Sequence, residues 1–308
     1  MMAWRDLYPF KSNYLWLPCV PHAFRGGDGV RMHYVDEGAG ETLLFVHGNP
    51  TWSFYWRNLI LGLRSDYRCL AIDHIGCGMS DKPEQGDYHL AGRIWDLMEF
   101  TEEVDLTGVT LVAHDWGGAI ALGAMTWMKS RIARVVLFNT GGFPPPFIPW
   151  RIAACRIPIL GTFAVRGLNA FAEAATVMAV EKHERMTSDV REGLLAPYDN
   201  WANRVAINEF IRDIPFTPRH TTWEPLEQLE GHLPEIGKRP TMLIWGMKDW
   251  CFRPECLERF QQHWPNTEVH KFDDCGHYVV EDAHERIVPL MRDFLARHPL
   301  PSPQAISE

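Results

Sequence analysis

Apolar residues recur along this chain in two alternating periods. Short runs of β-branched and other apolar residues, typical of buried strands, occur at residues 42–46, 68–72, 109–113, 135–138, 241–245 and 267–272. Segments with apolar residues at helical spacing occur at residues 54–63, 89–100, 119–129, 254–263 and 283–296. This alternation predicts an α/β fold with a mostly parallel sheet covered by helices on both faces.

Two stretches depart from the alternation. Residues 20–37 predict a β-hairpin, with RGGDGV supplying its turn. Between residues 138 and 241 no strand pattern is convincing: the proline-rich GGFPPPFIPW is followed by helical spacing through 152–180 and 190–212.

The second departure predicts an insertion in the sheet-forming domain. We expect a core domain of residues 1–140 and 223–308 and a helical cap domain of residues 141–222. Ligands of open parallel sheets bind beyond the carboxyl ends of the strands. A cap in this position would therefore cover the ligand site and exclude water from it.

Composition excludes several classes of function. A formal net charge of −9 and the lack of a dense Lys/Arg stripe argue against nucleic acid as a partner. No run of 18 apolar residues is present, so we expect no membrane-spanning segment. Seven cysteines and a start without signal-peptide features predict reduced thiols and a cytoplasmic protein. The chain has 14 histidines but neither an H-E-x-x-H motif nor a paired C-x-x-C motif, so no metal site is expected. We expect no other cofactor either.

The segment LVAHDWGG at residues 111–118 carries the clearest candidate chemistry. A strand pattern, a sharp turn with two glycines and a helix pattern follow one another, as in the G-x-S-x-G elbow that presents a nucleophilic serine. Asp115 stands where that serine would be. A carboxylate nucleophile would form an ester with an sp³ carbon of the substrate, or an anhydride by attack on a carbonyl.

Two later loops supply partners for Asp115. Enzymes with a nucleophile elbow carry their triad in the chain order nucleophile, acid, histidine. Asp249 follows the predicted strand PTMLIWG, and His277 follows the predicted strand TEVHKFDD. We interpret the three residues as a catalytic triad in which Asp249 orients the imidazole and stabilises the imidazolium.

Two further residues are candidates for binding the leaving group. The indole of Trp116, directly after the nucleophile, can only donate a hydrogen bond. Asn49 follows the first predicted parallel strand, where this kind of fold keeps its second oxyanion donor. His47, His114 and Asp73 lie near these loops, and we expect them to have structural roles.

Five motifs give the chain a resemblance to a known family. VHGNPTWSFYWRNLI, DHIGCGMSDKP, AHDWGGAIAL, WGMKDW and GHYVVEDAHERI resemble the haloalkane dehalogenase-like branch of the α/β-hydrolases, and the likeness runs from about residue 7 to residue 295. The resemblance implies an eight-stranded α/β-hydrolase fold with an inserted helical cap. It also implies that Asp115 attacks, that His277 is the base, and that Asn49 and Trp116 bind the leaving group. Some relatives keep a glutamate after the strand before the cap; here Asn139-Thr140 stands there, which leaves Asp249 as the acid.

A narrower group within this branch is most similar. DHIGCGMSDKP, APYDNWANRVAINEFIRDIP and EDAHERIVPLMRDFL resemble the β-lactone decarboxylases of bacterial long-chain olefin biosynthesis. This resemblance implies a hydrophobic β-lactone as substrate, a cis-olefin and CO2 as products, and the β-lactone synthetase of the same pathway as a partner.

Other functions stay open at this point. A haloalkane dehalogenase would use the same residues to hydrolyse a carbon–halogen bond, with His277 activating water. An epoxide hydrolase ranks third, because such enzymes typically use two cap tyrosines and residues 142–222 contain only Tyr198. A binding module that has lost its activity is a further alternative.

Overall fold

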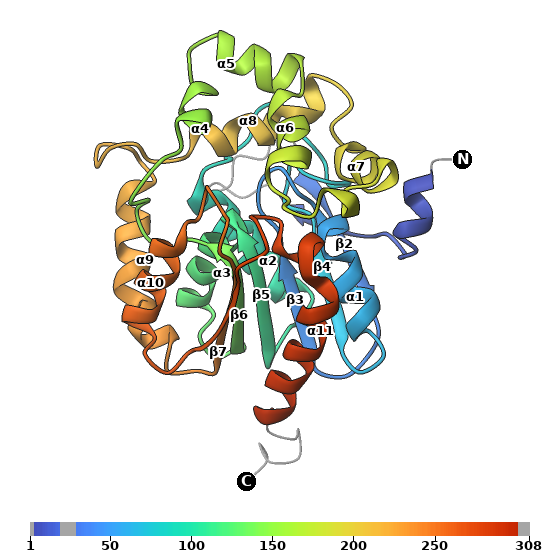
Figure 1. The fold of residues 1–308 in the computed structure, drawn as a ribbon, viewed down its shortest axis with the longest axis vertical. Helices are drawn as coiled ribbons and strands as arrows, with labels where there is room; N and C mark the ends of the chain where they lie inside the picture. The colour runs from blue at the N-terminus through green and yellow to red at the C-terminus, as the bar shows by residue number, and fades with distance from the viewer. Residues whose placement is uncertain (1–2, 19–28, 301–308) are drawn as a thin grey trace.

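The computed structural model describes residues 3–18 and 29–300, which form one sheet with helices around it (Figure 1). The sheet has eight strands in the order β1-β2-β4-β3-β5-β6-β7-β8. Strands β3 to β8 are parallel, whereas β2 pairs antiparallel with both β1 and β4. The strands are β1 (Asn13–Pro18), β2 (Gly29–Glu37), β3 (Thr42–Val46), β4 (Arg68–Ile72), β5 (Val109–Asp115), β6 (Ile132–Thr140), β7 (Thr241–Gly246) and β8 (Glu268–Phe272). The mostly parallel sheet predicted from the sequence is confirmed.

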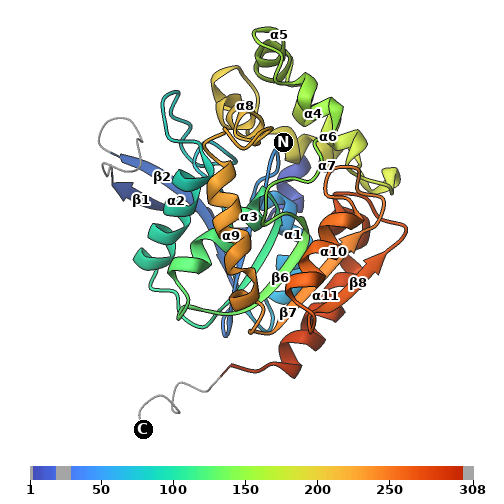
Figure 2. The same cartoon turned by 90° about the vertical axis from the view of Figure 1, so that its left-hand side faces the viewer.

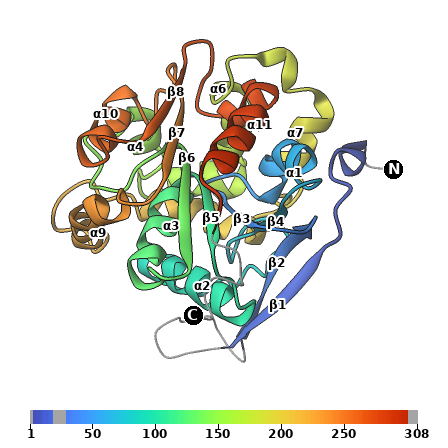
Figure 3. The same ribbon diagram turned by 90° about the horizontal axis from the view of Figure 1, so that it is seen from below.

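Helices cover both faces of the sheet. On one face lie α1 and α11, and on the other lie α2, α3, α9 and α10 (Figure 3). Their bounds are α1 (Arg57–Leu63), α2 (Leu90–Glu103), α3 (Trp116–Trp127), α9 (Trp223–Ile236), α10 (Pro254–His263) and α11 (Val279–Arg297). Successive residues of β3 show why its run is apolar throughout. Leu44 and Val46 belong to the core under α3, and Leu43 and Phe45 belong to the core under α1 and α11.

A helical segment between β6 and β7 stands over the carboxyl ends of the strands (Figures 1 and 2). We call residues 141–222 the cap segment. It contains the helices α4 (Trp150–Ala154), α5 (Leu160–Thr162), α6 (Ala170–Met178), α7 (Ser188–Leu195) and α8 (Val205–Arg212). The helical spacing through 152–180 is divided among α4, α5 with the π-helical segment Phe163–Gly167 that continues it, and α6. The divisions fall at Ile159 and Asn169, whose positive φ angles of 63° and 55° interrupt a right-handed helix.

The N-terminal hairpin differs from its prediction. Antiparallel pairing runs from Asn13 opposite Tyr34 to Pro18 opposite Gly29, so the first strand begins before residue 20. Most of the predicted turn RGGDGV lies outside the described residues. The sequence signal for β1 is weak because alternate residues of this edge strand face solvent, so it lacks the continuous apolar run of the central strands, although Leu17 is buried.

One helix begins earlier than the sequence pattern predicts. The helix after the elbow begins at Trp116 rather than at residue 119, so it starts immediately after Asp115. Within residues 3–18 and 29–300, no helix is long and apolar enough to cross a membrane.

Candidate active site

Asp115 lies at a sharp turn between the last residue of β5 and the first residue of α3. Its φ of 56° is unusual for a residue with a side chain and directs the carboxylate toward the cap segment. Two glycines make room for this turn. A Cβ at Gly48 would lie 2.1 Å from Asp115 Oδ1, and a Cβ at Gly117 would lie 2.3 Å from the carbonyl oxygen of Val46. The predicted elbow is therefore present, and both close approaches require glycine.

The structure brings Asp115, His277 and Asp249 together. His277 Nδ1 lies 2.7 Å from Asp249 Oδ2, and His277 Nε2 lies 3.4 Å from Asp115 Oδ2. All three residues are buried, with exposures of 7%, 3% and 5% for His277, Asp249 and Asp115. Asp249 Oδ1 accepts the backbone N–H groups of Cys251 and Phe252 at 2.6 and 3.0 Å. These two bonds hold the carboxylate in the loop after β7, so its other oxygen faces the imidazole.

The two neighbouring carboxylates determine the charge of His277. Burial by itself would lower the pKa of His277, but the charges of Asp249 and Asp115 and hydrogen bonds to both raise it to about 10. Burial likewise would raise the pKa of Asp115, yet the hydrogen bond and charge of His277 hold it below its usual range. At neutral pH the resting site thus contains an imidazolium between two carboxylates.

Asn49 and Trp116, the candidates for binding the leaving group, both lie next to Asp115. The backbone N–H of Asn49 donates to Asp115 Oδ1 at 2.7 Å. The amide Nδ2 donates to the carbonyl oxygen of Ile207 at 3.3 Å, which is a long hydrogen bond. Trp116 Nε1 has no hydrogen-bond partner among the described residues, and its side chain lines the cavity above Asp115. Both side chains can therefore turn an N–H toward a ligand.

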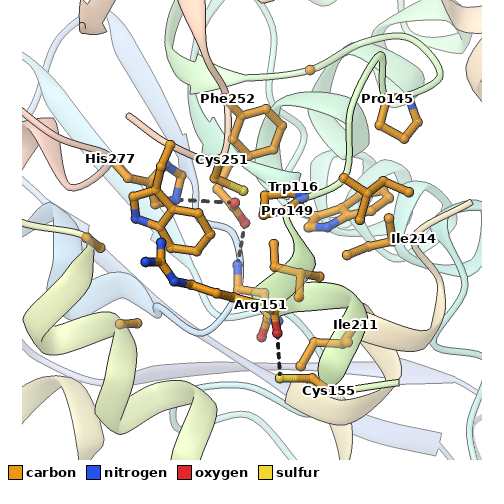
Figure 4. Close-up of a pocket in the computed structure, with 18 of the residues that line it drawn as sticks. Trp116, Pro145, Pro149, Arg151, Cys155, Ile211, Ile214, Cys251, Phe252 and His277 are labelled. Atoms are coloured by element: carbon orange, nitrogen blue, oxygen red, sulfur yellow. Dashed lines mark hydrogen bonds and ion pairs between the residues drawn. The ribbon is translucent and has the colours of Figure 1, made fainter. Parts of the chain in front are cut away.

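Asp115 lines a cavity of about 210 Å³ between the sheet and the cap segment. Figure 4 shows other residues of its lining, among them Trp116, Phe252 and His277. Most of its lining is apolar and comes from the cap segment and the loop after β7, and includes Phe143, Phe171, Ile211, Ile214 and Phe252. Asn49, Asp115 and His277 provide polar groups on the core side. Such a cavity fits a small hydrophobic molecule with one reactive polar centre.

Neighbouring residues hold the loops of the site in place, as expected. His114 Nε2 bonds to the carbonyl oxygen of His277 at 2.9 Å. Burial, followed by the charge of His277, lowers the pKa of His114 to about 3, so His114 is neutral. Asp73 accepts the backbone N–H groups of Ser53 and Met79 at 2.7 and 2.8 Å, which joins the loops after β3 and β4.

Two residues that line the site were missed by the sequence analysis. The ring of Phe252 stacks on His277 at 5.8 Å between centroids, with an angle of 22° between the rings. Arg151 projects from α4 into the lining of the cavity and lies over the ring of Trp250. Neither belongs to a recognisable motif, because only the folding of the cap segment and the loop after β7 brings them to Asp115.

Tyr198, the one tyrosine of the cap segment, is absent from the cavity lining. Its hydroxyl donates to the carbonyl oxygen of Thr51 at 3.2 Å and accepts the N–H of Gly78 at 3.3 Å. It therefore joins the cap segment to the core and is not placed to protonate a substrate. Within the described part of the chain, no cluster of three or more His, Cys, Asp or Glu residues could hold a metal ion.

Known proteins are similar to this chain over most of its length. The model of the family described as alpha/beta hydrolase matches residues 43–290. A protein of Shewanella oneidensis named cis-3-alkyl-4-alkyloxetan-2-one decarboxylase is 39% identical, over 94% of this chain and 89% of that protein. A protein of the same name from Xanthomonas campestris is 42% identical, over 88% of this chain and 94% of that protein.

Haloalkane dehalogenases are also similar. Haloalkane dehalogenase 2 of Mycobacterium bovis is 33% identical, over 92% of this chain and 94% of that protein. Among solved structures, the haloalkane dehalogenase DatA from Agrobacterium tumefaciens superimposes with a TM-score of 0.80 at 25% identity, over 94% of this chain and 97% of that one.

Proposed function

Since this chain belongs to the alpha/beta hydrolase family, we propose that it is a cis-β-lactone decarboxylase in which Asp115 is the nucleophile. The observation that carries the proposal is the position of Asp115, which lines a mostly apolar cavity beside a positively charged His277. The similarity to two relatives named as oxetan-2-one decarboxylases, which extends over nearly the whole chain, supports a four-membered lactone as the substrate.

The geometry supports a mechanism without water. Asp115 Oδ2 attacks the ring carbon that bears the lactone oxygen, with inversion, and the carbon–oxygen bond breaks to leave a tethered carboxylate. Asn49 and Trp116 line the same cavity, and their Nδ2 and Nε1 groups are the proposed donors to this carboxylate. The bond to the carboxylate carbon then breaks, its electrons form the alkene, and the Asp115 ester leaves anti as a carboxylate. The products are a cis-alkene and CO2; attack at the carbonyl, with an anhydride intermediate, is the alternative first step.

His277 has a consistent role in this sequence. As an imidazolium it lies against Asp115 in the resting site and favours the return of Asp115 as a carboxylate in the last step. A haloalkane dehalogenase would require the neutral imidazole to activate water after the ester has formed. Esterification removes one of the two negative charges that raise the pKa of His277, so the same site could also support hydrolysis. This is why dehalogenation is the second candidate.

One comparison of substrates separates the two candidates. The purified protein is incubated with a long-chain cis-β-lactone and, separately, with 1,2-dibromoethane, and alkene, CO2 and bromide are measured. We expect alkene and CO2 from the lactone. Rapid bromide release without any alkene would contradict the decarboxylase proposal.

The role of Asp115 is tested by substitution and isotope labelling. Asp115→Ala should abolish alkene formation while the circular dichroism spectrum stays unchanged. Full activity of this variant on every substrate would exclude Asp115 as the nucleophile.

A single turnover in ¹⁸O-water should leave Asp115 unlabelled under the ring-carbon mechanism, whereas hydrolysis of the ester would place ¹⁸O in its carboxylate.

The described cysteines and Tyr198 bear on the cellular setting and on the alternative functions. We propose that the protein acts in the cytoplasm, which is consistent with free thiols at all six described cysteines, and that a β-lactone synthetase supplies its substrate. Epoxide hydrolysis ranks third because the hydroxyl of Tyr198 is bonded to Thr51 and Gly78. A binding module without activity is disfavoured, since the structure keeps both carboxylates and the imidazole within hydrogen-bonding or ion-pair distance.

A further inference from the structure

We propose that the outer end of the cap segment docks onto an anionic lipid surface. This outer end, which we call the cap tip, consists of the exposed apolar side chains of Ile157, Ile159, Leu160 and Phe163. Figures 1 and 2 show α5, which contains Leu160, at the end of the molecule farthest from the sheet.

The apolar exposure of the cap tip is large. Ile159 is 84% exposed, Leu160 68%, Phe163 55% and Ile157 50%, all within seven residues of chain. Concentrated apolar exposure of this kind is typical of interaction sites. Ile159 also has a φ of 63°, which β-branched residues avoid, and burial does not compensate for this conformation because the side chain is exposed.

The charges around the cap tip favour an anionic partner. Residues 141–172 contain three arginines and no aspartate or glutamate, although the whole chain has a net charge of −9. Arg166 is paired with Glu84, whereas Arg151 and Arg156 form no ion pair with any described residue. The guanidinium of Arg156 donates to the carbonyl oxygen of Ile214 and lies over the ring of Phe216, and Asp213 and Arg212 are its charged neighbours. Arg151 also lies 5.4 Å from the ring centre of Trp150, which is 73% exposed. Exposed tryptophan, and arginine without an ion pair, beside an apolar surface are characteristic of contacts with lipid headgroups.

The cap tip is continuous with the wall of the active-site cavity. In α4 and the residue after it, Arg151, Ile152 and Cys155 line the cavity, and the chain reaches Ile157 two residues later. Docking would therefore bring the cavity close to the acyl chains of the lipid. This step rests on the proposed function, because a β-lactone with two long alkyl chains partitions into lipid rather than water. The need to obtain such a substrate is our reason for favouring lipid over a protein partner.

Co-sedimentation of the full chain with vesicles tests the proposal. Vesicles of phosphatidylcholine alone are compared with vesicles in which roughly one third of the lipid is phosphatidylglycerol. We expect the protein to pellet mainly with the anionic vesicles and to be released by high salt. The triple variant Ile159→Ser, Leu160→Ser, Phe163→Ser should lower the bound fraction on the order of tenfold. Trp127→Ser is the matched control: Trp127 is 76% exposed at the last residue of α3, remote from the cap, and its loss should not change binding.

Three outcomes would overturn the proposal. The wild-type protein could stay in the supernatant with both kinds of vesicle, or the triple variant could bind as well as wild type. Light scattering could instead show a wild-type dimer that the triple variant abolishes, with no vesicle binding, which would identify the cap tip as an interface between copies of the chain. Circular dichroism of the triple variant verifies that it is folded.

A separate assay distinguishes this proposal from the proposed function. Decarboxylation of a short-chain cis-β-lactone dispersed in detergent does not require a lipid surface, so the triple variant should retain this activity. Turnover without vesicle binding would contradict only the docking of the cap tip. Vesicle binding without turnover by the wild-type protein would contradict only the decarboxylase function.

Discussion

At the scale of single residues, the chemistry of the site depends on how His277 is shared between two carboxylates. Asp249 lies 2.7 Å from Nδ1 and Asp115 lies 3.4 Å from Nε2, so the firmer hydrogen bond is made to the residue that does not react. Together they raise the pKa of His277 from 6.5 to about 10 although burial opposes this. The stability that the charged imidazole contributes is therefore complete below pH 6.5 and is lost as the pH rises through about 10.

Asp249→Asn should lower the pKa of His277 because the closer of its two negative neighbours is removed. We expect a decrease of about one pH unit or more, measured by NMR titration of the imidazole ¹³Cε1 resonance. Asp293→Asn, which removes an exposed carboxylate of α11, is the control and should leave the titration of His277 unchanged. An unaltered pKa in Asp249→Asn would show that Asp115 alone holds the charge.

At the scale of elements, the cap segment is attached to the core by buried polar contacts. Besides the hydroxyl of Tyr198, the indole of Trp52 donates to the carbonyl oxygen of Gly193 at 3.0 Å. Asp282, at the start of α11, accepts backbone N–H groups from Glu181 and Lys182 at 2.9 to 3.2 Å. The residues of the cap segment that make these contacts lie in α7, in the loop after α6 and in the loop before α8. The cap is thereby fixed over the carboxyl ends of the strands.

Tyr198→Phe should destabilise this attachment. Thr51 and Gly78 would each keep a buried backbone group without its hydrogen bond, which costs roughly 1–3 kcal/mol of unfolding free energy. Denaturation in urea measures the effect, with Tyr14→Phe as the control because Tyr14 is 49% exposed on the edge strand. Equal stability of the two variants would mean that water replaces the hydroxyl of Tyr198.

At the scale of the whole molecule, a buried ion pair joins distant parts of the chain. Arg57 in α1 and Glu281 in α11 form two hydrogen bonds of 2.6 and 2.8 Å, 224 residues apart in sequence. Their side chains are only 4% and 2% exposed. The pair therefore locks two helices of the same face of the sheet together, close to the loop that carries His277.

Glu281→Gln should strongly destabilise the fold, because it leaves the buried guanidinium of Arg57 without a counter-charge. The expected loss of unfolding free energy is about 3–5 kcal/mol, measured by chemical denaturation. Glu235→Gln removes one partner of the exposed pair with Lys238 and should not shift the transition measurably. A small effect in Glu281→Gln would indicate that water reaches Arg57.

The sequence by itself determined the sheet, the elbow and the order of the candidate triad. Strands buried on both faces are apolar throughout, and an elbow needs a particular pattern of strand, turn and glycines, so β3 to β8 and the position of Asp115 were predictable. The assignment of residues 1–140 and 223–308 to the core and 141–222 to the cap remains a prediction.

Tertiary structure alone decided the contents of the site. The edge strand β1 has no continuous apolar run, and Arg151 and Phe252 line the same cavity as Asp115 only because of the path of the cap segment and of the loop after β7. The charge on His277 is likewise invisible in the sequence. It depends on the distances to two carboxylates in a buried environment, and those distances exist only when three loops of the folded sheet meet.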